Sequence, residues 1–166
     1  MPSIFLHGLG RPLLLLHALV AIVLGGSSVH HAVIAVLALR GQAPRLRLAR
    51  LYALVALLAY IATLTTGALV YPRYRYFVRG LYLDRHAPWA SNLFDFKENI
   101  ATLGLPLAVG ALIVALDLRR HLELKDSGSG HFRQTLVLYG FLALGTATIS
   151  IFNLIAGFLC TSVHGI

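Results

Sequence analysis

Charged residues are scarce in this chain of 166 residues, and their scarcity excludes most soluble folds. Only 12% of the residues are Asp, Glu, Lys or Arg, whereas 58% are hydrophobic. A soluble domain usually carries about a quarter charged residues, because its surface has to face water. The deficit indicates an integral membrane protein, and the length of residues 1–166 fits a single membrane domain.

Cysteine and the common catalytic motifs are also almost missing. The single cysteine, Cys160, lies in an apolar run, so it can form no intramolecular disulfide and cannot build a thiolate metal site alone. The sequence contains no GxSxG, HExxH, CxxC or glycine-rich phosphate loop. We therefore expect no firm metal site and no catalytic activity of the chain's own.

The net charge of +8 does not have the distribution of a nucleic-acid-binding protein. The cations lie between the apolar runs, where lipid head groups would be, and do not line one polar face. We therefore expect the lipid bilayer as the main partner, together with other membrane subunits or a second copy of the chain, and no nucleic acid.

Four apolar runs are each long enough to cross a bilayer, which takes about 20 helical residues. The sequence predicts membrane spans over about 12–39, 48–70, 88–118 and 133–160. Pro72 is expected to end the second span. Residues 1–10 make a poor signal peptide, so the first helix is expected to be retained. The Ser-Gly-Ser-Gly tract at 127–130 predicts a flexible turn.

Residues 71–99, between the second and third spans, are rich in arginine and aromatic residues. This composition is typical of a membrane–water interface and predicts an interfacial cap over about 73–84. Two readings of Asp95 and Glu98 are open: they pair with the cap arginines, or they bind a cation together with His86. The cap itself either anchors the chain or contacts a quinone or an anionic lipid head group. The residues concerned are Arg73, Arg75, Arg79, Arg85, Trp89, Asp95 and Glu98.

Small and polar residues recur every 3.5 residues along each span, which places them on one side of each helix. In lipid, that side meets other helices. The spacing predicts an all-α, left-handed bundle of four transmembrane helices. Hydroxyl and amide groups on these stripes are expected to bond between helices or to line a polar path: Ser28, Thr63, Thr146, Ser150 and Asn153.

Histidines in the first span point to a cofactor as an alternative to simple packing. His17 and His31 are fourteen residues apart, so both project from nearly one face, about 21 Å apart along the axis. Such a pair, with His30 beside it, could hold haem b if a second axial ligand were available. The candidates are His86 or His164 on the His17 side and His121 or His131 on the other, unless a second copy supplies them.

Four spans place both termini and residues 71–99 on one side of the membrane. The connections at 40–50 and 117–133 hold eight Lys and Arg residues and the opposite side holds six, which favours cytoplasmic connections and an external cap in a bacterial inner membrane.

Three functions remain open from the sequence. The first is a small, non-catalytic subunit or binding module of a membrane complex. The second is an electron-transfer anchor that binds haem b or a quinone through His17 and His31. The third is a small transporter or channel, although no acid lies within the apolar runs themselves to carry a coupling ion.

Overall fold

The computed structural model describes residues 7–123 and 130–164, and within these ranges the chain is helical and contains no strand. A short 3₁₀ turn precedes the first long helix and another precedes the second, while a π-helical segment follows the second. The elements are η1 (His7–Leu9), α1 (Gly10–Leu39), η2 (Ala43–Leu48), α2 (Ala49–Arg73), η3 (Tyr74–Leu83), α3 (Asp84–His86), α4 (Pro88–Glu123) and α5 (Gly130–Val163).

Four helical segments are long and apolar enough to cross a membrane, which indicates that the protein is integral to one. They run over Gly10–Leu39, Leu46–His86, Pro88–Glu123 and Gly130–Val163. Two predictions concern other residues. The poor signal peptide was predicted from residues 1–10, which include 1–6, and the flexible turn was predicted mainly on residues 127–129. Residues 1–6 and 127–129 lie outside the described residues.

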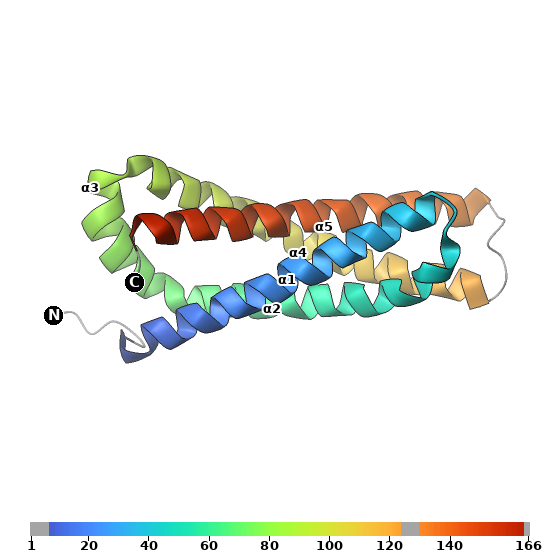
Figure 1. The fold of residues 1–166 in the computed structure, drawn as a ribbon, viewed down its shortest axis with the longest axis horizontal. Coiled ribbons are helices and arrows are strands. Elements are labelled where there is room, and N and C mark those ends of the chain that lie inside the picture. Colours follow the sequence, from blue (N-terminus) through green and yellow to red (C-terminus); the bar gives the residue numbers. More distant parts are fainter. Residues whose placement is uncertain (1–6, 124–129, 165–166) are drawn as a thin grey trace.

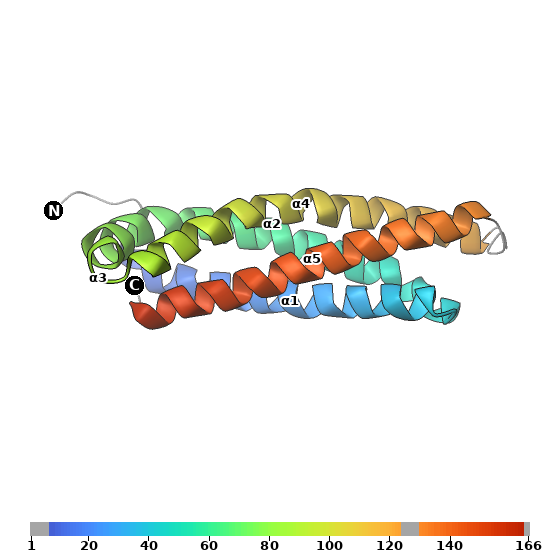
Figure 2. The same cartoon turned by 90° about the horizontal axis from the view of Figure 1, so that it is seen from above.

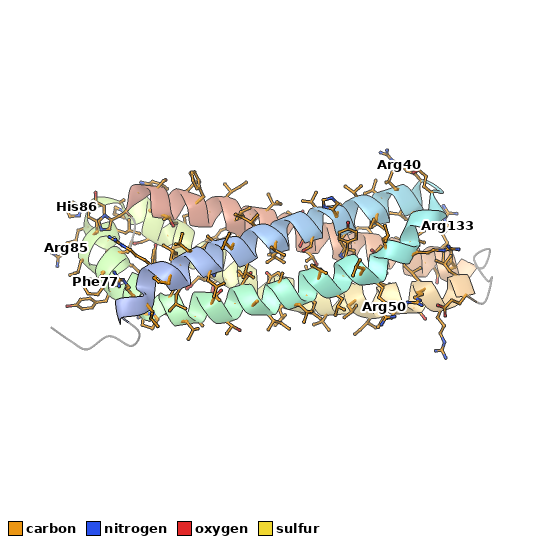
Figure 3. The ribbon with its side chains drawn as sticks, turned by 60° about the horizontal axis from the view of Figure 1, so that its bottom comes forward. Arg40, Arg50, Phe77, Arg85, His86 and Arg133 are labelled. Atoms are coloured by element: carbon orange, nitrogen blue, oxygen red, sulfur yellow. The ribbon has the colours of Figure 1, made fainter. Side chains whose placement is uncertain are left out.

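The four long helices form an elongated antiparallel bundle (Figure 1). Helix α1 packs against α2 and α5, and α4 packs against α5 and α2. The end of α5, η3 and α3 lie at the same end of the bundle as the beginning of α1, whereas η2 lies at the other end (Figures 1 and 2). Charged side chains mark both ends: Arg85 at one, and Arg40, Arg50 and Arg133 at the other (Figure 3).

The stripes of small and polar residues face the interior, as their spacing predicts. Many of the leucines, isoleucines and phenylalanines between them are exposed around the outside, where acyl chains would lie; Phe141 and Phe158 are each 72% exposed. The buried members of the stripes include Leu24, Ser28, His31, Ala35, Ala49, Ala53, Ala56, Tyr60, Ala108, Ala111, Ala115, Tyr139, Ala143, Thr146, Ser150 and Cys160.

Helix α2 does not end at Pro72, contrary to the sequence prediction. Pro72 lies inside α2, and the helix continues past Arg73 into the π-helical η3. A proline removes one backbone donor and disturbs the turn before it, but a membrane helix tolerates this where the winding adjusts locally. The segment from Leu46 to His86 is consequently helical throughout.

Packing differs between the two halves of the bundle. In the half near η2, a continuous core joins Ala35, Ala53, Ala115 and Tyr139. In the half near η3, most of the stripe residues are only partly buried, and they line cavities instead. The candidate site therefore lies in the half near η3.

Candidate functional site

Two neighbouring cavities, of about 420 Å³ and about 390 Å³, lie inside the half of the bundle near η3. Cavities of this size hold small ligands. They share polar lining from three helices, namely His17 of α1, Lys97 and Glu98 of α4, and Asn153 of α5. We call these two spaces together the cap-side cavity.

The cap-side cavity reaches the outside of the bundle between α1 and α5. Leu15, Ile22 and Phe158 line its larger part and are also 66%, 59% and 72% exposed. The two helices meet further along, where a Cβ on Gly25 would lie 3.5 Å from a Leu154 methyl carbon. From that crossing α1 turns away from α5 (Figure 1). The opening therefore faces sideways, toward the acyl chains of a surrounding bilayer.

His17 is held in one orientation at the wall of this cavity. Its Nδ1 lies 3.1 Å from the backbone oxygen of Thr63 and 3.1 Å from Oγ1 of Thr66, both in α2. A carbonyl oxygen can only accept, so Nδ1 carries the proton and neutral His17 keeps Nε2 as an acceptor. Gly67 leaves room for the ring, because a Cβ there would lie 3.2 Å from Cε1 of His17. Helix α2 thus fixes the tautomer of His17 for a ligand.

Lys97 brings a positive charge to the same cavity. Its Nζ lies 4.4 Å from the centre of the Phe94 ring, a cation–π contact. No carboxylate of a described residue forms an ion pair with Lys97. Glu98 also lines both parts of the cavity, so the site combines an ammonium, a carboxylate and the imidazole of His17.

Aromatic rings form the wall of the cavity nearest the cap. Tyr74 stacks on Phe94 with ring centres 4.1 Å apart, and Tyr71 stacks on the same ring at 6.4 Å. Tyr74 is 8% exposed, and its hydroxyl has no hydrogen-bond partner among the described residues. A buried hydroxyl without a partner is costly, so its position on the cavity wall offers a donor to an occupant.

The deep end of the cavity is closed by contacts between helices. Tyr60 of α2 donates a hydrogen bond to the backbone oxygen of Ala101 at 2.8 Å and lies against Gly104 of α4. Ser28 of α1 and Ser150 of α5 lie 3.3 Å apart through their hydroxyl oxygens. These contacts join α2 to α4 and α1 to α5 at the deep end of the cavity.

Most of the other predicted polar bonds stay within one helix. Thr63, Thr146 and Ser150 each donate to the backbone oxygen four residues earlier, at 2.7–2.8 Å, and the amide nitrogen of Asn153 does the same at 2.9 Å. Of the five predicted residues, which also include Ser28, only the pair Ser28 and Ser150 forms a described side-chain bond between helices. The hydroxyls of Thr63 and Thr146 therefore fill space on the stripes and do not link neighbouring helices within the described part of the chain.

An ion-pair cluster fixes the end of the bundle above the cavity. Arg79 of η3 donates two hydrogen bonds to the Asp95 carboxylate, at 2.5 and 2.8 Å, and its Nε lies 3.6 Å from Asp84. Ser91 donates to the same Asp84 carboxylate at 2.6 Å. The paired geometry holds η3 and α3 against the beginning of α4. Asp95 is thus engaged with Arg79, whereas His86 bonds to the backbone oxygen of Tyr82 at 3.0 Å.

The other cap residues lie around this cluster. Arg75 donates to the hydroxyl of Tyr71 at 3.4 Å, and Arg73 lies 6.0 Å from the centre of the Phe77 ring. Arg85 is exposed, and Trp89 is 56% exposed. Phe77, Arg85 and His86 all lie at this end of the bundle (Figure 3).

The structure does not pair the histidines in the way that two axial haem ligands require. Among the residues that the structure describes, His17 is the histidine that lines the cap-side cavity. His31 is 1% exposed and packs edge-on against Tyr139, with ring centres 5.0 Å apart, inside the closed half of the bundle. His30 is exposed and stacks on Tyr52.

The remaining histidines gather at the two ends of the bundle. Tyr82 stacks with both His86 and His164, at 4.8 and 4.1 Å, at the cap end. His121 and His131 lie together at the other end, 5.1 Å apart between ring centres.

Three residues of the cavity, Lys97, Tyr74 and Phe94, were not among the site residues predicted from the sequence. Lys97 had a signal in the sequence, because it is the one charged residue on the four stripes. The aromatic wall had none, since its tyrosine and phenylalanine rings look the same as interfacial anchors in the sequence. Comparison with protein-family models, with curated proteins and with solved structures finds no match to this chain.

Proposed function

We propose that the protein is a non-catalytic membrane binding module whose cap-side cavity holds the polar head of a membrane lipid of the quinone type. The observation that carries the proposal is Lys97, a partly buried ammonium on the wall of an open cavity without a described carboxylate in ion-pair contact. A charge at such a place is costly unless a polar group of a ligand meets it.

The donors and acceptors around the cavity fit a head group that carries oxygen atoms at both ends. Lys97 and Tyr74 can donate hydrogen bonds to carbonyl or phosphate oxygens, whereas Nε2 of His17 can accept from a hydroxyl. The stacked rings of Tyr74 and Phe94 offer a flat apolar surface to a ring. A quinone and its quinol, which exchange carbonyls for hydroxyls, meet both requirements.

The sideways opening provides a place for the tail of such a ligand. Residues 100–116 of α4 are apolar and extend about 25 Å, so Lys97 and Glu98 lie at the edge of the hydrocarbon layer. A head group at Lys97 would therefore lie at the boundary between the hydrocarbon layer and the polar layer of the bilayer. Its tail would leave the cavity between α1 and α5, beside Leu15 and Phe158.

Two further features support a binding module rather than a transporter. The cavity ends at Tyr60 and Ser150, and the half beyond it is closed around Ala35, Ala115 and Tyr139. We also infer that the bundle is left-handed, and that residues 73–84 form an interfacial cap on the external side of a bacterial inner membrane. The exposed apolar outside leaves room for other membrane subunits.

The proposal is tested by identifying what copurifies with the protein. Wild type, Lys97→Met and His17→Phe are extracted with their surrounding lipid into polymer discs and separated from free lipid. Quinones and phospholipids are then quantified by mass spectrometry. Phe141→Leu, on the exposed surface of α5, is the matched control. We expect at least a tenfold loss of one bound species in both cavity variants and no loss in the control.

Each outcome assigns or rejects a ligand. Loss of a quinone supports the proposal, whereas loss of one anionic phospholipid identifies a lipid site of the same chemistry. Equal lipid content in all four proteins overturns the proposal. A visible Soret band that disappears on substitution of His17 or His31 would instead establish the haem b alternative.

A further inference from the structure

A second group of ligating side chains lies at the other end of the bundle, where α4 ends and α5 begins. Asp117 and His121 are four residues apart in α4, and His131 is in the first turn of α5. One carboxylate oxygen of Asp117 and one ring nitrogen of each histidine all lie within 4.8 Å of one another. Residues four apart on a helix project to the same side, which is how helices present two ligands to one metal ion.

The orientation of His121 suits a metal ligand. Its Nδ1 lies 3.0 Å from the backbone oxygen of Asp117. A ring nitrogen that donates to a carbonyl leaves Nε2 as the coordinating atom, and this bond fixes the ring in the manner usual for metal-binding histidines. The side chain of His121 is 15% exposed, and its ring lies 6.3 Å from that of Phe132. Asp117 and His131 are more exposed and leave access from water.

The local charge leaves room for a cation. Arg119 is paired with Glu123 at 2.7 Å, so its charge is already compensated. Arg133 lies at this end of the bundle and is exposed, where water and salt screen it (Figure 3). Asp117 has a weak contact with His121, at 3.7 Å, and retains oxygen atoms for a metal ion.

We propose that Asp117, His121 and His131 bind a divalent transition-metal ion of the zinc class and thereby clip the end of α4 to the beginning of α5. Two imidazoles and one carboxylate form a common donor set for zinc, with water in the fourth position. Ligand atoms about 2.0–2.1 Å from a tetrahedral ion lie about 3.3 Å apart. The ligand atoms lie within 4.8 Å of one another, so rotation of the three side chains has to bring them to this separation.

The experiment uses the full chain in detergent or lipid discs, purified without a polyhistidine tag and stripped with a chelator. Zinc binding is measured by calorimetry, and cobalt is used as a spectroscopic probe because tetrahedral Co²⁺ gives visible bands. The variants are Asp117→Asn, His121→Ala and His131→Ala. The matched control is His86→Ala, an exposed histidine at the cap end.

We expect one zinc ion per chain with micromolar or tighter affinity, tetrahedral cobalt bands and a higher melting temperature with zinc. Each of the three substitutions is expected to weaken binding at least tenfold and to abolish the thermal shift, while His86→Ala retains both. His131→Ala changes an exposed position, so its helical content should match that of wild type. Absence of zinc binding by wild type, or retention of it by all three variants, overturns the proposal.

Discussion

Tyr60 and Gly104 depend on each other, because the tyrosine hydroxyl occupies the space in which any larger side chain at position 104 would lie. A Cβ on Gly104 would overlap the hydroxyl oxygen and the ring of Tyr60. The hydroxyl is in turn fixed by its bond to the backbone oxygen of Ala101. The close approach of α2 and α4 below the cap-side cavity therefore requires glycine at 104.

We expect Gly104→Ala to lower the free energy of unfolding by about 1–3 kcal/mol, because the buried tyrosine has to move out of its hydrogen bond. Reversible unfolding by denaturing detergent measures the change. Gly26→Ala is the control, since a Cβ at Gly26 meets nothing within 4 Å. In a Tyr60→Ala background the Gly104→Ala penalty should largely disappear; a penalty of the same size in both backgrounds would contradict this explanation.

Some features of individual side chains in and above the cap-side cavity could not be predicted from the sequence. The partial burial of Lys97 and the missing partner of Tyr74 depend on how far α1 diverges from α5, and no local pattern encodes that divergence. The pairing of Arg79 with Asp95 was one of several that the acids and arginines of the cap allowed. Charge composition offered pairing with the cap arginines as one of two readings, and only the path of η3 selects Arg79 as the partner of Asp95.

At the scale of single helices, α5 shows most directly why its stripe predicted the packing. Thr146, on the stripe, is fully buried, whereas Thr148, two residues later, is exposed. The heptad-like period made this distinction predictable, because residues two apart project to different sides of a helix. The extension of α2 through Pro72 was not predictable in this way, since proline ends many helices in water.

The pair of threonines gives a matched test of the seam. We expect Thr146→Leu to destabilise the bundle by about 1–3 kcal/mol, because the larger side chain forces α5 away from its neighbours. Thr148→Leu should change stability little, since it replaces one side chain on the exposed surface with a more lipophilic one. The same unfolding assay compares them. Equal effects of the two substitutions would show that the seam does not set the packing.

At the scale of the whole molecule, the number of spans and their order were predictable, because they follow from four long apolar runs. The side of the membrane on which each end lies rests on a difference of two cations between the two sides. The proposed orientation therefore needs its own measurement.

We expect the 40–50 connection to face the cytoplasm and α3 to face outward. In a Cys160→Ala background, a membrane-impermeant maleimide added to intact cells should label Arg85→Cys and leave Gln42→Cys unlabelled; both positions are exposed in the structure. After permeabilisation, both should react. Labelling of Gln42→Cys alone in intact cells would reverse the orientation and would place the cap-side cavity near the inner leaflet.

Because the cap-side cavity opens sideways between α1 and α5, the measured affinity for a ligand from the bilayer depends on the amount of lipid and detergent present. An occupant that enters from the bilayer is dissolved in two dimensions, so occupancy follows its mole fraction among the lipids and not its concentration in water. Adding detergent dilutes that pool even when the amounts of protein and ligand stay constant. A titration in micelles would thus report a weaker interaction than the same titration in a small disc, with no change in any contact within the cavity.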